Sequence, residues 1–196
     1  MNEESRPRVD IRREKVEQAA RELFIRRGFH ATGIAQIAEM SGIKVQQIYR
    51  DFANKEGIVA AIVERDAGTL FDEIPRIGSR TQGGRAALRA WIEQTLTGVV
   101  AGDQSPLFLE IFAEASRNAR IAAILQDIEL RVRPALIEAF VGFAGPTAER
   151  QHLSRVADLF FVFIGGISQR AIANPALDVA YLVDMMAEMI EAQIPQ

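Results

Sequence analysis

The spacing of apolar residues constrains this chain more than any other feature of its sequence. Apolar side chains recur at intervals of three and four almost throughout, the period of an amphipathic α-helix. An early example is the series Val16, Ala19, Ala20, Leu23 and Phe24. No stretch alternates convincingly between apolar and polar residues, as a half-buried strand would. Gly28 is a plausible end of the first helix, and Asn54 a plausible N-cap of the fourth, which Pro75 and Gly78 should break before a loop over 77–85. The sequence therefore predicts an all-α protein of about nine helices.

Composition excludes several classes of protein. The chain has 196 residues, 48% hydrophobic and 25% charged, which excludes a disordered polymer. It has no cysteine, so disulfides, a thiol nucleophile and a cysteine zinc site are excluded. The N-terminus is charged and resembles no secretory signal. The longest apolar run, 159–167, is shorter than the roughly 20 residues of a membrane span. We therefore expect a soluble, cytoplasmic protein without membrane contact.

Charge is distributed unevenly along the chain. The net charge of −3 argues against a generally basic nucleic-acid binder. Up to Glu56, however, eleven Lys and Arg residues outnumber nine Asp and Glu residues. All three lysines, Lys15, Lys44 and Lys55, lie in this segment. A mildly basic N-terminal segment on an acidic remainder is compatible with local contact to DNA.

Residues 32–52 have the pattern of a helix-turn-helix. Thr32 is a possible N-cap of one helix, and Ser41-Gly42 ends that helix, because glycine adopts a left-handed turn at little steric cost. A short second helix then carries Ile48 and other apolar residues inward. A single α-helix fits the major groove of DNA, where every base pair presents a distinct pattern of donors and acceptors.

The outer surface of this short helix carries the candidate base-reading side chains. They are Val45, Gln46, Gln47 and Arg50. A glutamine can pair in bidentate fashion with adenine, which is worth about 1–3 kcal/mol of discrimination. Lys44, Arg50 and Lys55 supply charge for phosphates. An ordinary solvated helix face would leave the same residues outside, so the pattern alone favours DNA binding only moderately.

From about Val9 to Glu64 the sequence resembles the TetR family of transcriptional regulators. The resemblance is carried by ARELFIRRGFHATGIAQIAEMSGI and IYRDFANKEGIVAAI. It implies a helix-turn-helix DNA-binding domain of three helices over 1–56 and a larger helical effector-binding and dimerisation domain over 57–196. It also implies that Thr32, Tyr49 and Lys55 contact phosphates. The like residues are Phe24, Gly28, Phe29, Thr32, Ile37, Ala38, Gly42, Tyr49, Phe52, Lys55 and Glu56.

Three positions depart from the family pattern. Lys44 stands where a serine cap is frequent, so the short helix begins without a side-chain acceptor. Gln46 and Gln47 replace a pair of smaller residues and place longer side chains toward the groove. Asp51 occupies a position that is often histidine, where phosphates would repel it unless Arg50 or Lys55 pairs with it or it accepts a hydrogen bond from cytosine. The operator of a relative therefore cannot be assumed.

Two sets of residues in the C-terminal part are candidates for a dimer interface and for an effector pocket. In TetR-like proteins the last two long helices pair with their copies in a second subunit. The expected interface residues are Phe160, Phe163, Ile164, Ile167, Leu182, Met186 and Met189. The expected lining of a hydrophobic pocket is Trp91, Leu107, Phe108, Phe112 and Phe140. Packing inside one subunit is the alternative for both sets. For the first set we favour the dimer, because two apolar helices at the end of a small domain leave too few partners within one chain. For the second set, each aromatic taken singly is more often a core residue, and only the group supports a hydrophobic effector.

Catalysis finds little support. Glu149 and His152 have the spacing of one half of a di-iron site, but the second half is absent. No cofactor, metal site or catalytic residue is expected. The sequence predicts a TetR-like repressor that binds a palindromic DNA operator as a homodimer and is released by a small hydrophobic effector. The alternatives are a helical adaptor that binds protein and, less favoured, an all-α enzyme.

Overall fold

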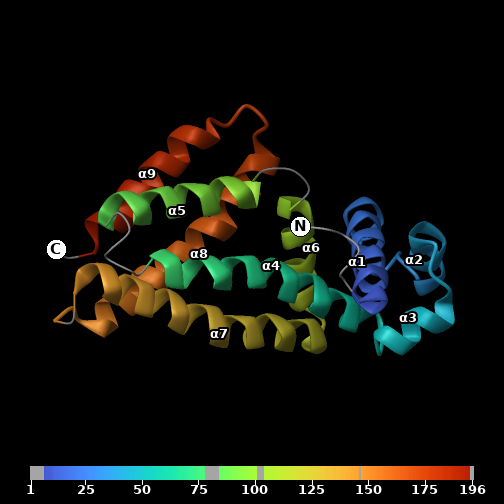
Figure 1. Ribbon diagram of the computed structural model, residues 1–196. Helices are drawn as coiled ribbons and strands as arrows, with labels where there is room; N and C mark the ends of the chain where they lie inside the picture. The colour runs from blue at the N-terminus through green and yellow to red at the C-terminus, as the bar shows by residue number, and fades with distance from the viewer. Residues whose placement is uncertain (1–6, 78–83, 101–103, 146, 195–196) are drawn as a thin grey trace. The chain divides into compact units, whose positions relative to one another are not determined.

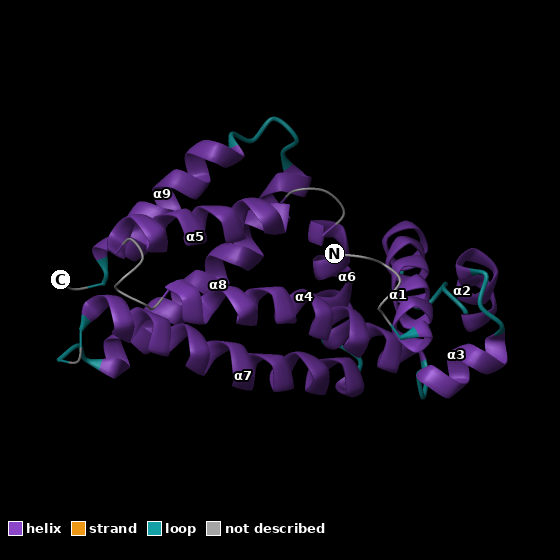
Figure 2. Cartoon of the chain, viewed as in Figure 1, coloured by secondary structure: helices purple, strands orange, loops and turns teal. Residues whose placement is uncertain are grey.

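The computed structural model describes residues 7–77, 84–100, 104–145 and 147–194, and every regular element in these ranges is an α-helix (Figure 2). Nine helices occur in the described ranges: α1 (Arg8–Arg27), α2 (Ile34–Ser41), α3 (Val45–Asp51), α4 (Lys55–Ile77), α5 (Gly84–Val100), α6 (Gln104–Ala115), α7 (Ala119–Ala144), α8 (Arg150–Ala173) and α9 (Val179–Ala192). This confirms the predicted all-α class. The expected break at Pro75 is wrong, because α4 continues to Ile77, and most of the expected loop 77–85 lies outside the described residues.

Glycine and asparagine determine where the first helices end and begin. Gly28 ends α1 with a φ of 79° and Gly42 ends α2 with a φ of 70°, conformations that favour glycine. Asn54 caps α4, since its side-chain oxygen accepts from the Gly57 N–H at 2.8 Å. These three expectations are confirmed. The N-cap of α2 is Gly33, whose N–H donates to the side chain of Gln36, so the expectation that Thr32 caps α2 is wrong.

The helices form two compact units that do not follow chain order. The described part of the first unit comprises 7–65 and Glu110–Leu125, and the second unit comprises the described residues of 66–109 and 126–194. Helices α4, α6 and α7 therefore each contribute residues to both units. A functional boundary after Glu56 stays a prediction, since compactness alone does not define one.

The second unit is built around α8. Helices α5 and α9 pack against each other and against α8 (Figure 1). At the centre, the ring of Trp91 stacks on Phe160 with centroids 5.1 Å apart, and Phe140 from α7 is fully buried in the same cluster. The apolar periodicity thus reflects burial of one face of each helix.

Helix α8 is long and apolar enough to cross a membrane by length and composition alone. A core helix passes the same test, and the buried face of α8, with Phe160 and Ile167, belongs to the core of the second unit. Outside this buried face, α8 carries the exposed apolar residues Val162 and Ile172.

The stack of Trp91 on Phe160 gives a test of this core. Phe160→Ala should lower the free energy of unfolding by about 3–5 kcal/mol, because the deletion leaves a cavity in a fully buried cluster. Trp91 is the only tryptophan, so its fluorescence during urea unfolding reports on this site. Leu130→Ala on α7, where the side chain is 74% exposed, is the control and should change little. Equal effects of the two substitutions would contradict the packing described.

Candidate nucleic-acid interface

The helix-turn-helix is supported by a small core in the first unit. Phe24, Ile37, Ile48 and Phe52 are all buried, and they come from α1, α2, α3 and the residue after α3. Helix α2 contacts α1 and α3, and α3 also contacts α1. Because these contacts fix one face of each short helix, the opposite face of α3 is presented to solvent.

The outward face of α3 carries most of the predicted base-reading side chains. Gln46 and Arg50 are exposed, and Val45 and Tyr49 are 36% and 56% exposed. Gln47 is half-buried. Lys44, the N-cap residue of α3, is exposed and makes no side-chain cap, as the sequence indicated. The structure therefore brings amide, phenol, guanidinium and ammonium groups onto two turns of one helix, the chemistry that base edges and phosphates require.

Thr32 and Lys55 do not lie on this outer face. Thr32 is 1% exposed, and its hydroxyl donates to the carbonyls of Leu23 and Gly28, so it is not available to a phosphate. The ammonium group of Lys55 donates to the carbonyls of Phe29 and Thr32 and lies 4.1 Å from the centroid of the Phe29 ring. Burial lowers the pKa of Lys55, although the charges of Glu56 and Glu114 oppose that effect. In this structure both side chains hold the turn between α1 and α2.

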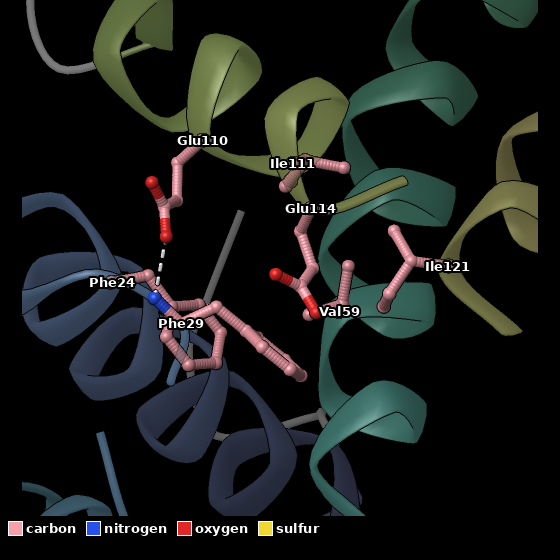
Figure 3. A pocket seen from close by; sticks show the side chains of 7 residues that line it. All are labelled: Phe24, Phe29, Val59, Glu110, Ile111, Glu114 and Ile121. Carbon is pink, nitrogen blue, oxygen red and sulfur yellow. Dashed lines mark hydrogen bonds between the residues drawn. The ribbon is translucent and has the colours of Figure 1, made fainter. Parts of the chain in front are cut away.

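We call residues 28–32 the α1–α2 corner, and the second half of α6 binds it. Glu110 accepts a hydrogen bond from the Phe29 N–H at 2.6 Å (Figure 3). A β-carbon at Gly28 would lie 3.2 Å from the same carboxylate, and the φ of 79° there also disfavours other residues. Beside this contact is a pocket of about 10 Å³, room for about one water molecule. Its lining residues are Phe24, Phe29, Val59, Glu110, Ile111, Glu114 and Ile121.

Glu114, one turn further along α6, is a buried carboxylate with several partners. It lies 2.9 Å from His30 Nε2 and accepts hydrogen bonds from Asn118 and Arg117. Burial disfavours its charge, but the hydrogen bonds from Asn118 and Arg117, with the electrostatic influence of His30 and Arg117, outweigh burial and hold its pKa below the ordinary value. The negative charge of α6 is thus fixed against the α1–α2 corner. Arg117 and Asn118 lie within one helical turn of Glu114, whereas Phe29 and His30 are far from α6 in the sequence, so no local pattern indicated their contacts with it.

Asp51 has a partner that the sequence did not predict. Its carboxylate pairs with Arg12, near the start of α1, and not with Arg50 or Lys55 as considered from the sequence. Arg13 donates to the backbone carbonyl of Asp51 at 2.7 Å. The hydrogen bond from Arg12 lowers the pKa of Asp51, while burial opposes the shift. A separation of 39 residues between partners leaves no local pattern by which sequence could have found this pair.

The residues predicted to line an effector pocket do not gather in one unit. Trp91 and Phe140 are buried in the core of the second unit, where Phe108 packs partly buried against them and Leu107 is also buried. Phe112 is 49% exposed and lies on the part of α6 that belongs to the first unit. Among the described side chains, Trp91 Nε1 is a buried nitrogen without a hydrogen-bond partner.

The predicted dimer residues divide into two groups. Phe160, Ile164 and Ile167 are buried within their own unit, which argues against a place for them between subunits. Phe163, Leu182 and Met186 are partly buried, and Met189 is 49% exposed. The exposed apolar positions on the last two helices include Val162 on α8 and Tyr181, Met185 and Met189 on α9. The helical period identified the apolar face of each helix, but it cannot distinguish a face that is buried within the subunit from one that faces a second subunit.

Two short helices joined by a left-handed glycine, packed on α1 and polar on their outer side, define the helix-turn-helix class of DNA-binding domains. Residues 18–62 match the family model described as bacterial regulatory proteins, tetR family. This match confirms, for the N-terminal segment, the resemblance to the TetR family drawn from the sequence.

Curated relatives carry names of transcriptional regulators. The chain is 32% identical over 84 residues to the HTH-type transcriptional activator FasR of Mycolicibacterium smegmatis, a match that covers 43% of this chain and 38% of FasR. It is 26% identical over 125 residues to the HTH-type transcriptional regulator UidR of Escherichia coli, covering 61% of this chain and 60% of UidR. The chain thus spans less than two thirds of the length of these relatives. Neither is named as an enzyme, in agreement with the expectation from the sequence.

Solved structures show the same fold over nearly the whole chain. A complex of SmeT with triclosan superposes with a TM-score of 0.77 at 18% identity, covering 95% of this chain and 92% of that one. Bacillus subtilis FadR in complex with stearoyl-CoA gives a TM-score of 0.75 at 16% identity, covering 92% and 98%. At these identities the likeness establishes the fold, and it confirms an N-terminal helix-turn-helix followed by a larger helical region.

The hydrogen bond between Glu110 and Phe29 can be tested directly. Glu110→Ala leaves a buried N–H unpaired and should destabilise the first unit by about 1–3 kcal/mol. The Phe29 amide should then exchange faster with solvent deuterium. Glu110→Gln retains a carbonyl oxygen as acceptor and should keep most of the protection. Unchanged exchange at Phe29 in the alanine variant would show that α6 does not hold the α1–α2 corner in solution.

Proposed function

We propose that the protein is a cytoplasmic transcriptional repressor that binds a palindromic operator as a homodimer and is released by a small hydrophobic effector. The observation that carries the proposal is the outer face of α3, where Gln46, Tyr49 and Arg50 are exposed on a helix whose inner face is fixed by packing. A helix with one buried and one polar, basic face is suited to a major groove. Among relatives FasR is named an activator, and we propose repression because it requires only occupancy of the operator.

A dimer is supported by exposed apolar surface on the last two helices. Tyr181, Met185 and Met189 recur every fourth residue of α9 and are 60%, 39% and 49% exposed, so they form one apolar stripe. Val162 on α8 is 66% exposed, and Gly166, one turn further, is exposed and would allow close approach of another helix. Such stripes are typical of interfaces between subunits. A two-fold dimer then requires an operator with two-fold symmetry.

The effector is proposed to bind in the second unit beside Trp91. The indole N–H is buried without a partner among the described residues, and a buried donor gains when a ligand supplies an acceptor. The ring of Phe160 stacks on the indole, and the core cluster to which both belong, with Phe140 and Leu96, is apolar. A small molecule with an apolar body and one acceptor oxygen fits this chemistry. The ligands named in the structures of SmeT and FadR also have apolar parts. Release requires that the effector prefer a state that binds the operator poorly.

The DNA-binding proposal is tested by selecting random duplexes on the purified protein. We expect a two-fold symmetric site whose affinity falls steeply as salt rises, because phosphate contacts release counterions. Gln46→Ala with Gln47→Ala should lower preference for that site by roughly 10-fold or more for each base that a glutamine reads. A reporter driven through the selected site should then be repressed by the wild type only.

Gln18→Ala is the control for the glutamine variant, since Gln18 is exposed on α1 and lies outside the outer face of α3. It should select the same site as the wild type. If ligand-free wild-type protein enriches no site, the repressor proposal fails and the adaptor alternative gains. If the reporter is activated through the selected site, DNA binding stands and the proposed sign of regulation fails.

The dimer has a separate test. Met185→Glu with Met189→Glu places two charges in the apolar stripe and should convert a dimer to a monomer in sedimentation equilibrium, because a desolvated like-charged pair opposes association. Leu130→Glu, at an apolar residue 74% exposed on α7, should leave the mass unchanged. A wild type that sediments as a monomer at micromolar concentration would contradict the proposed interface.

A further inference from the structure

We propose that Asp51 is a positioning residue for base recognition: by holding the C-terminal end of α3 against Arg12 and Arg13 of α1, it sets the orientation in which α3 meets the base pairs. The inference rests on the DNA-binding function proposed above. It gives Asp51 the role of fixing the geometry of the neighbouring side chains and not of contacting a base or a phosphate itself.

The contact between Asp51 and Arg12 has the geometry of a strong, directional pair. Arg12 Nε donates to Asp51 Oδ2 at 2.5 Å, and Arg12 Nη2 donates to Asp51 Oδ1 at 2.8 Å. Two parallel hydrogen bonds fix direction as well as distance, which a single charge contact does not. The Asp51 side chain is 6% exposed and that of Arg12 21% exposed, so water competes weakly with the pair. Asp51 is therefore turned toward α1 and away from solvent.

Arg13 holds the main chain of the same residue. Its Nη1 donates to the backbone carbonyl of Asp51 at 2.7 Å, and its guanidinium carbon lies 4.4 Å from the centroid of the Phe52 ring. The last carbonyls of a helix lack intrahelical partners, and a cation there is favourable. Consecutive residues of α1 thus hold the side chain and the backbone at the end of α3.

Helix α3 needs such support because it is short. It has seven residues and no side-chain hydrogen bond at its N-cap. Isolated helices of this length are unstable in water. Ile48 on α3 and Phe52 directly after it are buried, and this apolar packing sets which face of α3 points inward. The hydrogen bonds of Asp51 are directional where apolar packing is not, so they limit the remaining rotation of Gln46 and Gln47 relative to the groove.

Breaking the charged pair should change DNA binding in a way that the loss of a purely stabilising ion pair would not. While paired, Asp51 does not present a free carboxylate to phosphates and Arg12 does not present a free guanidinium. Asp51→Asn removes the negative charge, frees Arg12 and loosens the end of α3. Affinity for any DNA should therefore rise, while discrimination between sites should fall. A purely stabilising ion pair would lower thermal stability and leave discrimination unchanged.

The experiment compares the affinity of full-length protein for its selected site and for a scrambled duplex of equal length, at two salt concentrations. Glu22→Gln is the matched control, since it also removes one negative charge from the first unit and frees an arginine, Arg26, 2.9 Å away on the exposed side of α1. We define the affinity ratio as the affinity for the selected site divided by the affinity for the scrambled duplex. We expect Asp51→Asn to lower this ratio by roughly 5- to 100-fold and to raise affinity for the scrambled duplex. Glu22→Gln should keep the ratio of the wild type.

Arg12→Lys separates geometry from charge and remains informative if Asp51→Asn folds poorly. Lysine keeps the positive charge but cannot form the two parallel hydrogen bonds. We expect it to lower the affinity ratio as well. A wild-type ratio in a folded Asp51→Asn or Arg12→Lys protein would overturn the inference. If the wild type itself shows no preferred site, the DNA-binding function fails, and the inference fails with it.

Discussion

The helix-turn-helix depends on how the backbone of the α1–α2 corner is satisfied. This corner is tight, and buried carbonyl and N–H groups are costly when unpaired. Lys55 donates to the carbonyls of Phe29 and Thr32, while Glu110 accepts from the Phe29 N–H. One charge of each sign, from two other helices, therefore fixes the same turn. The position of α2, and through it α3, follows from these contacts.

Two residues that the resemblance to the TetR family assigned to phosphate contact, Thr32 and Lys55, have a structural role in this chain. Lys55 donates two hydrogen bonds to backbone carbonyls, and the hydroxyl of Thr32 is buried. Both side chains therefore stabilise the α1–α2 corner. In the proposed contact with DNA, the positive charges that remain outside on and beside α3 are those of Lys44 and Arg50. The proposed interface is accordingly narrow, since it consists of about two turns of α3 and the residue that precedes it.

Sequence reasoning predicted the helices well because their signals are local. The apolar period, the left-handed glycines at 28 and 42, and the cap at Asn54 act within a few residues of one another. The side chains exposed on α3 followed from the same period. The partners of Asp51 and of the α1–α2 corner could not be predicted, because they lie 39 and 81 residues away in the chain. The apolar stripes of α8 were found, but the period could not show which of them is buried within the subunit.

The first unit is discontinuous in the chain, and this affects its synthesis. Residues up to Arg65 leave the ribosome well before Glu110–Leu125, which complete the unit. Until then the Phe29 N–H lacks Glu110, and Phe24 and Val59 lack the cover of Ile111 and Ile121. The nascent N-terminal segment is therefore an incomplete domain during translation. Its final packing waits for a segment that is made after α5, so a chain interrupted before residue 110 would be exposed to proteases and chaperones.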